Sequence, residues 1–330
     1  MDTPKGIEDS ITLPDGRILA FKIWGDPAAT ANSTAFYFHG FPGSRNEGLI
    51  LHDAAVRHAM RIIAIDRPGM GKSWPVRPEA ASRTLLDWPL DVLALADHLE
   101  LERFGVIGVS GGAPYALATW HHDRTLRARC AGVCVVSGLW PQHLTARCRT
   151  FYALRAHWTF KIAGMWPRLT EIMFGLGVGA AAREACLTGD TRRLDKMMDL
   201  MLLMLPRADS EVLRANEGHA RDAIRATMSE AFRQGSRGTA VEAEVLCGND
   251  WGFRLEDVDV PEGKVVVWHG GEDVNVPLEM ATVSVPHLKG VDFRVLEEEG
   301  HVSLIVHKAD EIVDVMKSML EGKTQDEEDY

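Results

Sequence analysis

The sequence predicts an α/β protein with a mostly parallel sheet and helices on both faces. Short apolar runs alternate with stretches of helical periodicity along most of the chain, and several of these runs are uninterrupted. Continuous apolar strands are typical of parallel sheets that are covered on both sides. Between residues 140 and 245 no strand-like run occurs, and large apolar residues recur in an Arg-rich, helix-like stretch. We therefore expect one sheet domain that is interrupted by a helical insertion.

The first strands are predicted on either side of Pro14-Asp15-Gly16, a turn tripeptide between residues 10 and 24. Apolar runs predict further strands at 35–38 and 61–65, with a helix at 46–60 between them. Residues 87–99 show helical periodicity in their apolar positions. The second half of the sheet is expected from the runs 104–107, 130–136, 265–268 and 291–296, with helices at 113–122 and 304–320.

Composition narrows the class of protein. The chain has 330 residues, of which 46% are hydrophobic. Its net charge of −11 argues against nucleic acid as a partner. Residues 1–10 lack a signal-peptide pattern, and no run is long enough to span a membrane. Five cysteines, an odd number, favour reduced thiols over a disulfide framework. We expect a cytoplasmic protein without a membrane span and leave its oligomeric state open, a homodimer included.

The run Gly108-Val109-Ser110-Gly111-Gly112 is the most informative local pattern. It follows an apolar strand and precedes a helix-forming stretch, so Ser110 is expected at a sharp strand-to-helix turn. Small neighbours allow the strained backbone of such a turn, and the following amide lies at a helix N-terminus, which favours negative charge. These are the conditions that a nucleophilic serine needs.

A serine nucleophile also needs a base, and the base needs an acid. Asp273 follows the predicted strand 265–268, and His301 follows the strand 291–296, so both are expected at the same sheet edge as Ser110. Within this pattern His269 is an alternative base, and Asp250 or Glu272 are alternative acids.

Three other patterns resemble metal-binding or phosphate-binding motifs, but we do not interpret them as such sites. Cys130 and Cys134 fall in a predicted strand without a second ligand pair, and His121-His122-Asp123 is expected at an exposed helix end. Gly71-Lys72-Ser73 resembles the end of a phosphate loop, but Asp66 stands where that motif requires glycine. We therefore expect no metal, nucleotide or other cofactor.

With the serine turn, the late aspartate and the late Gly-His in this order, the chain resembles the α/β-hydrolase family. His39-Gly40-Phe41-Pro42-Gly43-Ser44 is similar to the family's oxyanion loop, and residues 66–73 to the turn after its next strand. The resemblance implies an α/β-hydrolase fold with an eight-stranded, mostly parallel sheet. It implies a core domain of residues 1–139 and 246–330 and an inserted helical cap at 140–245. The five acids and one Lys of residues 321–330 separately predict an acidic flexible tail.

By the same resemblance, Ser110 is the nucleophile, Asp273 the acid and His301 the base, with the backbone N–H groups of Phe41 and Gly111 as the oxyanion hole. The expected function is a serine hydrolase, or esterase, that cleaves a small or medium, mostly apolar ester, thioester or lactone through an acyl-enzyme. A C–C bond hydrolase, lyase or cyclase acting on a polyketide- or terpenoid-like metabolite is an alternative, and a non-catalytic ligand receptor is another. The residues expected to line the substrate pocket are His39, Trp140, Met201, Met204 and Val274.

Overall fold

The computed structural model describes residues 3–75, 83–248 and 250–322 and contains a single sheet of eight strands. The strand order is β1-β2-β4-β3-β5-β6-β7-β8, in which β1 and β2 pair antiparallel, β2 pairs antiparallel with β4, and all other pairs are parallel. The strands are β1 (Ile7–Thr12), β2 (Ile18–Gly25), β3 (Thr34–Phe38), β4 (Arg61–Ile65), β5 (Phe104–Val109), β6 (Cys130–Val136), β7 (Val265–Gly270) and β8 (Asp292–Leu296). The predicted mostly parallel, eight-stranded sheet is therefore confirmed.

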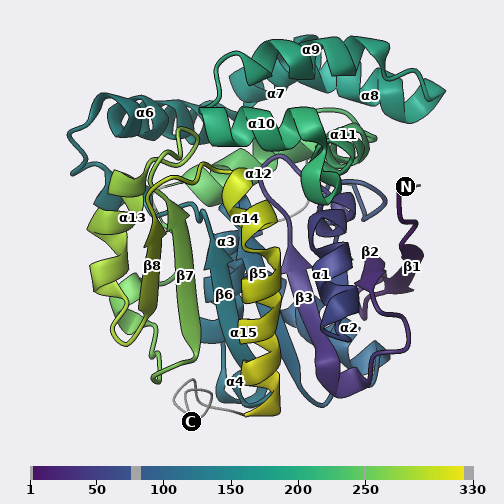
Figure 1. Cartoon of the computed structure of the whole chain (residues 1–330), viewed down its shortest axis with the longest axis vertical. Coiled ribbons are helices and arrows are strands. Elements are labelled where there is room, and N and C mark those ends of the chain that lie inside the picture. The colour runs from purple at the N-terminus through teal and green to yellow at the C-terminus, as the bar shows by residue number, and fades with distance from the viewer. Residues whose placement is uncertain (1–2, 76–82, 249, 323–330) are drawn as a thin grey trace.

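Helices cover both faces of the sheet (Figure 1). One layer contains α2 (Trp88–His98), α3 (Ala113–His121) and α13 (Leu278–Ser284), and the other contains α1 (His52–Arg57) and α15 (Ala309–Glu321). Alternate residues of β3 face opposite layers, because successive side chains of a strand point to opposite sides. The remaining sheet-domain helices are α4 (Arg124–Arg129), α14 (Ser303–His307) and the 3-10 turns η1 (Ala31–Ser33), η2 (Arg45–Leu51), η3 (Leu85–Asp87), η4 (Ser110–Gly112), η6 (Leu255–Asp257) and η7 (Val285–His287).

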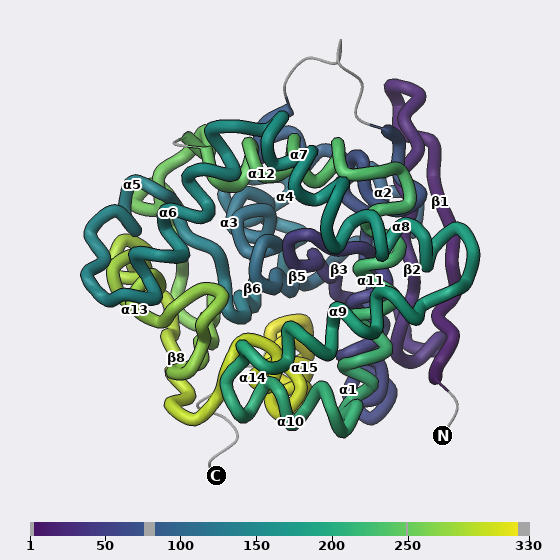
Figure 2. The backbone as a smooth tube through the Cα atoms, turned by 90° about the horizontal axis from the view of Figure 1, so that it is seen from above, coloured from purple at the N-terminus to yellow at the C-terminus, as the bar shows by residue number. Residues whose placement is uncertain are grey.

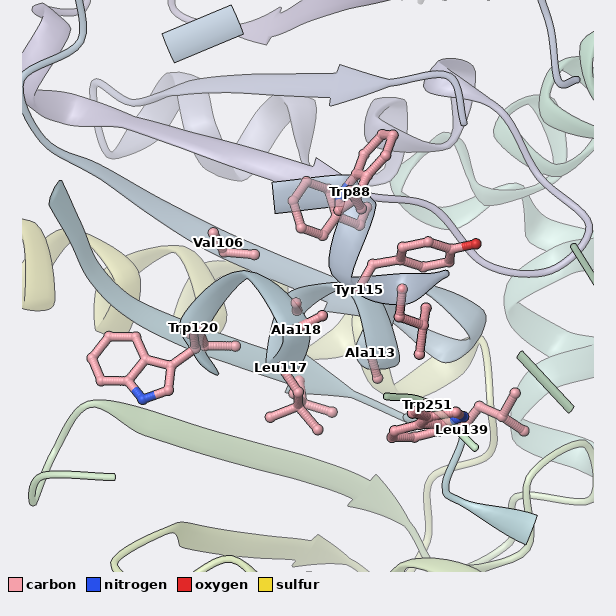
Figure 3. Packing of buried hydrophobic residues seen from close by; sticks show 14 of the residues in the cluster. Trp88, Val106, Ala113, Tyr115, Leu117, Ala118, Trp120, Leu139 and Trp251 are labelled. Carbon is pink, nitrogen blue, oxygen red and sulfur yellow. The ribbon is translucent and has the colours of Figure 1, made fainter. Parts of the chain in front are cut away.

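The larger core cluster is built around aromatic residues (Figure 3). Trp88 of α2 packs edge-on against Phe38 of β3 and Tyr115 of α3, with ring centroids 5.4 and 5.6 Å apart. These buried rings fix α3 against the sheet, and α3 follows η4, the 3-10 turn that starts at Ser110. The core therefore holds the turn on which the candidate nucleophile lies.

Between β6 and β7 the described residues form helices joined by loops and no strand, as expected. Those up to residue 247, here called the inserted helices, are α5 (Gln142–Thr145), α6 (Phe151–Met165), α7 (Pro167–Leu176), α8 (Val178–Thr188), α9 (Arg192–Leu202), α10 (Arg207–Ala215), η5 (Glu217–His219), α11 (Ala220–Ala231) and α12 (Arg237–Cys247). Figure 1 shows α6 to α11 across the top of the sheet, and Figure 2, seen from above, shows them spread over it. No described helix is long and apolar enough to cross a membrane.

Two predicted helices differ from the observed elements. The helix expected at 46–60 begins as the 3-10 turn η2 and continues as α1, and the helix expected at 304–320 is divided into α14 and α15. The division falls at Lys308, whose φ of −103° and ψ of 13° lie outside the α-helical range. Most of the predicted acidic tail, residues 323–330, lies outside the described residues.

Candidate active site

Ser110 lies at the tight turn between β5 and α3, with a φ of 51°. The glycines beside it are required by close packing. A Cβ on Gly112 would lie 2.0 Å from the Phe38 carbonyl oxygen, and a Cβ on Gly108 would lie 2.7 Å from Ala116 Cβ. The chain can therefore turn this sharply only because these positions carry no side chain. The result is a half-buried serine at the N-terminal end of a helix.

His301 and Asp273 are joined by a hydrogen bond of 2.7 Å between Nδ1 and Oδ2. They come from the loops after β8 and β7. Asp273 Oδ1 accepts the backbone N–H groups of Asn275 and Val276 at 2.9 and 2.8 Å, which fixes the carboxylate. Burial lowers the pKa of His301, but the charge of Asp273 and its hydrogen bond outweigh this effect and raise the pKa above 6.5.

The alternative base and acids lie elsewhere. His269 is fully buried, its Nε2 is 2.7 Å from the Val276 carbonyl oxygen and 3.7 Å from Asp273 Oδ2, and burial lowers its pKa. Glu272 is exposed, and Asp250 accepts the backbone N–H of Gly252. Among the described residues, only Asp273 of the three acids contacts the ring of His301.

Ser110 and His301 line one cavity of about 620 Å³. The described residues contain no hydrogen bond between their side chains; in substrate-free enzymes such contacts often tighten only when substrate binds. Most of the other lining residues are apolar, and about half of them come from residues 140–245, among them Phe160, Met198 and Leu202. The candidate nucleophile therefore faces an apolar cavity between the sheet and the inserted helices.

Phe41 and Gly111, the predicted oxyanion-hole residues, lie side by side at this cavity. A Cβ on Gly111 would lie 3.1 Å from the Phe41 backbone nitrogen, and both residues are part of the lining. The loop before Phe41 is held by Arg67, whose guanidinium donates to the carbonyl oxygens of His39 and Gly40. Arg67 is buried and also pairs with Glu242 of α12. Arg67 therefore binds both the loop before Phe41 and the inserted helix α12.

The predicted pocket residues are only partly brought together. Met201 and Val274 line the cavity. Trp140 and His39 are not part of its lining, and both are fully buried in the core. His39 Nδ1 is 2.8 Å from the Gly40 carbonyl oxygen, and burial lowers the pKa of His39. Met204 is not part of the lining either, because it follows the end of α9 and is 77% exposed. The structure therefore places Trp140 and His39 in the core and Met204 at the surface, rather than in the cavity lining as predicted.

Glu47 is a residue that the sequence reasoning missed. It is buried, lines the cavity, and accepts the Gly40 N–H at 2.8 Å and the Tyr37 hydroxyl at 3.0 Å through Oε1. Burial raises the pKa of this carboxyl group. The only sequence signal is its place three residues after Ser44, which is typical of a helix-capping box rather than of a site. The cavity lining therefore contains a buried acidic side chain that is not one of the predicted residues Ser110, Asp273 and His301.

Two further contacts join the inserted helices to the site loops. Asp209 of α10 is fully buried and accepts the backbone N–H groups of His301, Val302 and Ser303 at 3.0, 2.8 and 2.8 Å. Thr227 of α11 accepts the Ser44 N–H at 2.7 Å. The loops that carry the candidate base and the oxyanion-hole residues are both bound to the inserted helices.

The structure also shows the surroundings of the cysteines and of the His121-His122-Asp123 run. All five cysteines are free thiols, and burial raises the pKa of Cys130 to about 12. His121 stacks on Phe253 with ring centroids 5.0 Å apart, and His122 lies 3.5 Å from Asp123. In residues 3–75, 83–248 and 250–322, no group of three or more His, Cys, Asp or Glu side chains is arranged to hold a metal ion.

Comparison with known proteins identifies the family. The profile of the Alpha/beta hydrolase family matches residues 29–315, whereas no curated protein matches the chain in sequence. Similar solved structures include a thermophilic esterase from Thermogutta terrifontis, with 18% identity, 97% of this chain and 99% of that chain covered, and a TM-score of 0.59.

An enol-lactonase from Burkholderia xenovorans has 18% identity, covers 95% and 100% of the two chains and has a TM-score of 0.60. A bromoperoxidase from Bacillus anthracis has 16% identity, 96% and 100% coverage and a TM-score of 0.62. At such identities the likeness is one of fold. The strand order, the serine turn and the matched profile together place this chain in the Alpha/beta hydrolase family.

Proposed function

We propose that the protein is a serine hydrolase that cleaves a small or medium, mostly apolar carboxylic ester, thioester or lactone through an acyl-enzyme at Ser110. The observation that supports this most is the shared cavity of Ser110 and His301, with His301 bonded to a buried Asp273. Fixed in this way, the ring keeps its proton on Nδ1 and leaves Nε2 free to act as a base.

In the proposed reaction, Ser110 Oγ attacks the carbonyl carbon as His301 Nε2 takes the hydroxyl proton. The N–H groups of Phe41 and Gly111 stabilise the oxyanion of the tetrahedral intermediate, where one such donor is typically worth about 3 kcal/mol. His301 then gives the proton to the leaving alcohol or thiol, or to the ring oxygen of a lactone. A water molecule, deprotonated by His301, attacks the acyl-enzyme and releases the acid and Ser110.

The cavity supports an apolar substrate, because its lining consists mainly of aliphatic, aromatic and methionine side chains. We propose that residues 140–245 act as a cap that closes the cavity over a core domain of residues 1–139 and 246–330. The contacts of Asp209, Thr227 and Glu242 with the site loops support this division of roles.

The test is Ser110→Ala, with Ser33→Ala as the matched control at a serine outside the site. Hydrolysis of a p-nitrophenyl ester and labelling by a fluorophosphonate should be lost in Ser110→Ala and kept in Ser33→Ala. Turnover by Ser110→Ala at the wild-type rate excludes the mechanism. Labelling of Ser110 without turnover of any simple ester, thioester or lactone would instead support C–C bond hydrolysis, elimination or cyclisation on the same residues.

A further inference from the structure

The exposed large hydrophobic side chains are concentrated on the inserted helices. Outside residues 151–204, the described chain exposes only four of them: Ile7, Ile18, Val56 and Leu90. On α6 they include Leu154, Trp158, Ile162 and Met165, and on α7 they are Leu169, Ile172, Met173 and Leu176. We call these eight residues, with Phe151, Tyr152 and Trp166, the α6–α7 face.

The spacing of these positions gives each helix an apolar stripe that faces outward. The residues recur three or four positions apart, which is the pattern that a surface helix normally turns toward the core. Here α6 and α7 pack with their other sides against α12, where Gly164 of α6 comes close to Cys247. Leu176 is 77% exposed and Phe151 74%. An exposed patch of this extent marks an interaction site rather than an ordinary surface.

The cavity opens among the same helices. Arg155 and Thr159 of α6 and Met201 of α9 line the cavity and are exposed at the surface. Figure 1 shows α6, α7 and α9 at the same end of the molecule, above the sheet. A body that covers the α6–α7 face therefore also meets the entrance to the cavity.

The charge around this face is opposite to that of the whole chain. Residues 147–176 contain Arg147, Arg149, Arg155, Lys161 and Arg168 with Glu171 as the only acid, whereas the chain has a net charge of −11. In the described structure, Arg147, Arg155, Lys161 and Arg168 form no ion pair, although most other arginines do. Lys161 lies over the Trp158 ring at 5.1 Å, next to the apolar stripe. Basic side chains beside exposed Trp, Tyr, Phe and Leu are the composition of helices that lie on anionic membranes.

We propose that the α6–α7 face docks on the surface of an anionic lipid bilayer and brings the cavity entrance to the lipid. An apolar substrate can then pass from the bilayer into the cavity without crossing water. A second copy of this chain fits the face less well. A two-fold dimer would place the same patch against itself, so two basic surfaces would meet, and the entrance would be covered.

Flotation with lipid vesicles tests the proposal. At low salt the protein should float with vesicles of phosphatidylcholine and phosphatidylserine and much less with phosphatidylcholine alone, and high salt should weaken the association. Leu176→Glu should reduce vesicle association by about tenfold or more, while Leu90→Glu, the same change at an exposed position of α2, should leave it unchanged. Arg168→Glu should also weaken it, with Arg124→Glu on α4 as its control.

The outcomes separate this proposal from the proposed hydrolysis. Ser110→Ala should bind vesicles like the wild type, and Leu176→Glu should hydrolyse a soluble short-chain ester like the wild type, since Leu176 does not line the cavity. The proposal is overturned by absence of binding to phosphatidylserine vesicles at low salt, or by equal loss in Leu90→Glu. It is also overturned if light scattering finds a dimer that Leu176→Glu separates while vesicles bind neither protein.

Discussion

Asp209 accepts the backbone N–H of His301 at 3.0 Å, across 92 positions of the chain. Its other carboxylate oxygen accepts the N–H groups of Val302 and Ser303, so one buried acid of α10 holds the start of α14 and the loop before it. A carboxylate suits this place, because the first N–H groups of a helix have no partner within the helix. The position of the candidate base therefore depends on an inserted helix as well as on the sheet.

Replacing Asp209 by Asn should lower kcat/KM by about tenfold to a hundredfold, because a small displacement of a catalytic group has a large effect on rate. The amide keeps one oxygen but turns an NH2 group toward the backbone N–H that faced the other, which is left without an acceptor, so we expect a stability loss of about 1–3 kcal/mol. Ester hydrolysis and urea unfolding measure the two effects. The fall should appear in kcat more than in KM.

Glu211→Gln is the control for this variant, since Glu211 lies on the same helix but is exposed and, within the described part of the chain, pairs only with Arg207. It should change stability by less than about 0.5 kcal/mol. Unchanged kcat in a folded Asp209→Asn protein would show that Asp209 has no part in positioning His301.

The pH dependence of kcat/KM should have an acid limb above pH 6.5. The base must be neutral to accept the Ser110 proton, and Asp273 raises the pKa of His301 in spite of burial. Activity should therefore fall as the pH drops through this raised pKa. In Asp273→Asn the charge is lost while burial remains, so the acid limb should move to lower pH, with a plateau about 10⁴-fold lower. If the acid limb does not move in Asp273→Asn, the titration of a group other than His301 is responsible for it.

The raised pKa of His301 also predicts in which direction the free energy of unfolding changes with pH. Since the folded chain holds the His301 proton more tightly than the unfolded chain, this group's contribution is fully present below pH 6.5 and is lost as the pH rises through the folded-state pKa. Urea unfolding of wild type and His301→Gln across that range measures it. A difference between the two proteins that grows with pH would contradict the assignment.

Arg67→Met should cost about 3–5 kcal/mol, because Glu242 would remain buried without its cation. The double variant Arg67→Met/Glu242→Leu should be more stable than the single one, since it removes both charges. Arg57→Met, at a pair in which both side chains are more than half exposed, should cost less than about 1 kcal/mol. Urea unfolding gives all three values. A double variant no more stable than Arg67→Met would mean that the loop contacts of Arg67, rather than the buried charge, dominate.

Phe174→Ala should extend the range of acyl chains that the protein cleaves. Phe174 lines the cavity and packs between Phe41 and Phe232, with ring centroids 6.3 and 5.8 Å away. Each further methylene that the enlarged cavity buries should add about 0.8 kcal/mol, roughly fourfold in relative kcat/KM. A series of p-nitrophenyl esters measures this, with Phe151→Ala as a control outside the cavity. An unchanged chain-length profile would place the acyl group elsewhere.

The sequence predicted the sheet and the serine turn because their requirements are local. Uninterrupted apolar runs define the parallel strands, and the glycines beside Ser110 are demanded by contacts within the turn itself. Chain order placed Asp273 and His301 after neighbouring strands of one sheet but left His269, Asp250 and Glu272 open. Only the family resemblance selected the two residues that the structure joins by a hydrogen bond.

The remaining features depend on tertiary contacts that no local pattern records. In the sequence, Asp209 is an ordinary acidic residue near the start of a helix. Its role becomes visible only in the structure, where α10 packs against the loop before α14. Met204 looked like a neighbour of Met201, but α9 ends at Leu202 and the chain turns Met204 outward. Trp140 is an apolar residue at the boundary of the insertion, and periodicity does not tell the core from the cavity wall.

The bonds from α10, α11 and α12 to the site loops have a consequence for engineering. A chimaera that exchanged the whole insertion with that of a relative would lose Asp209, Thr227 and Glu242 together and leave their loop partners unmatched. Such a graft would have to carry residues of two distant loops with it. Altering the specificity is simpler at Met198 and Met201 of α9, whose side chains bind neither loop through hydrogen bonds.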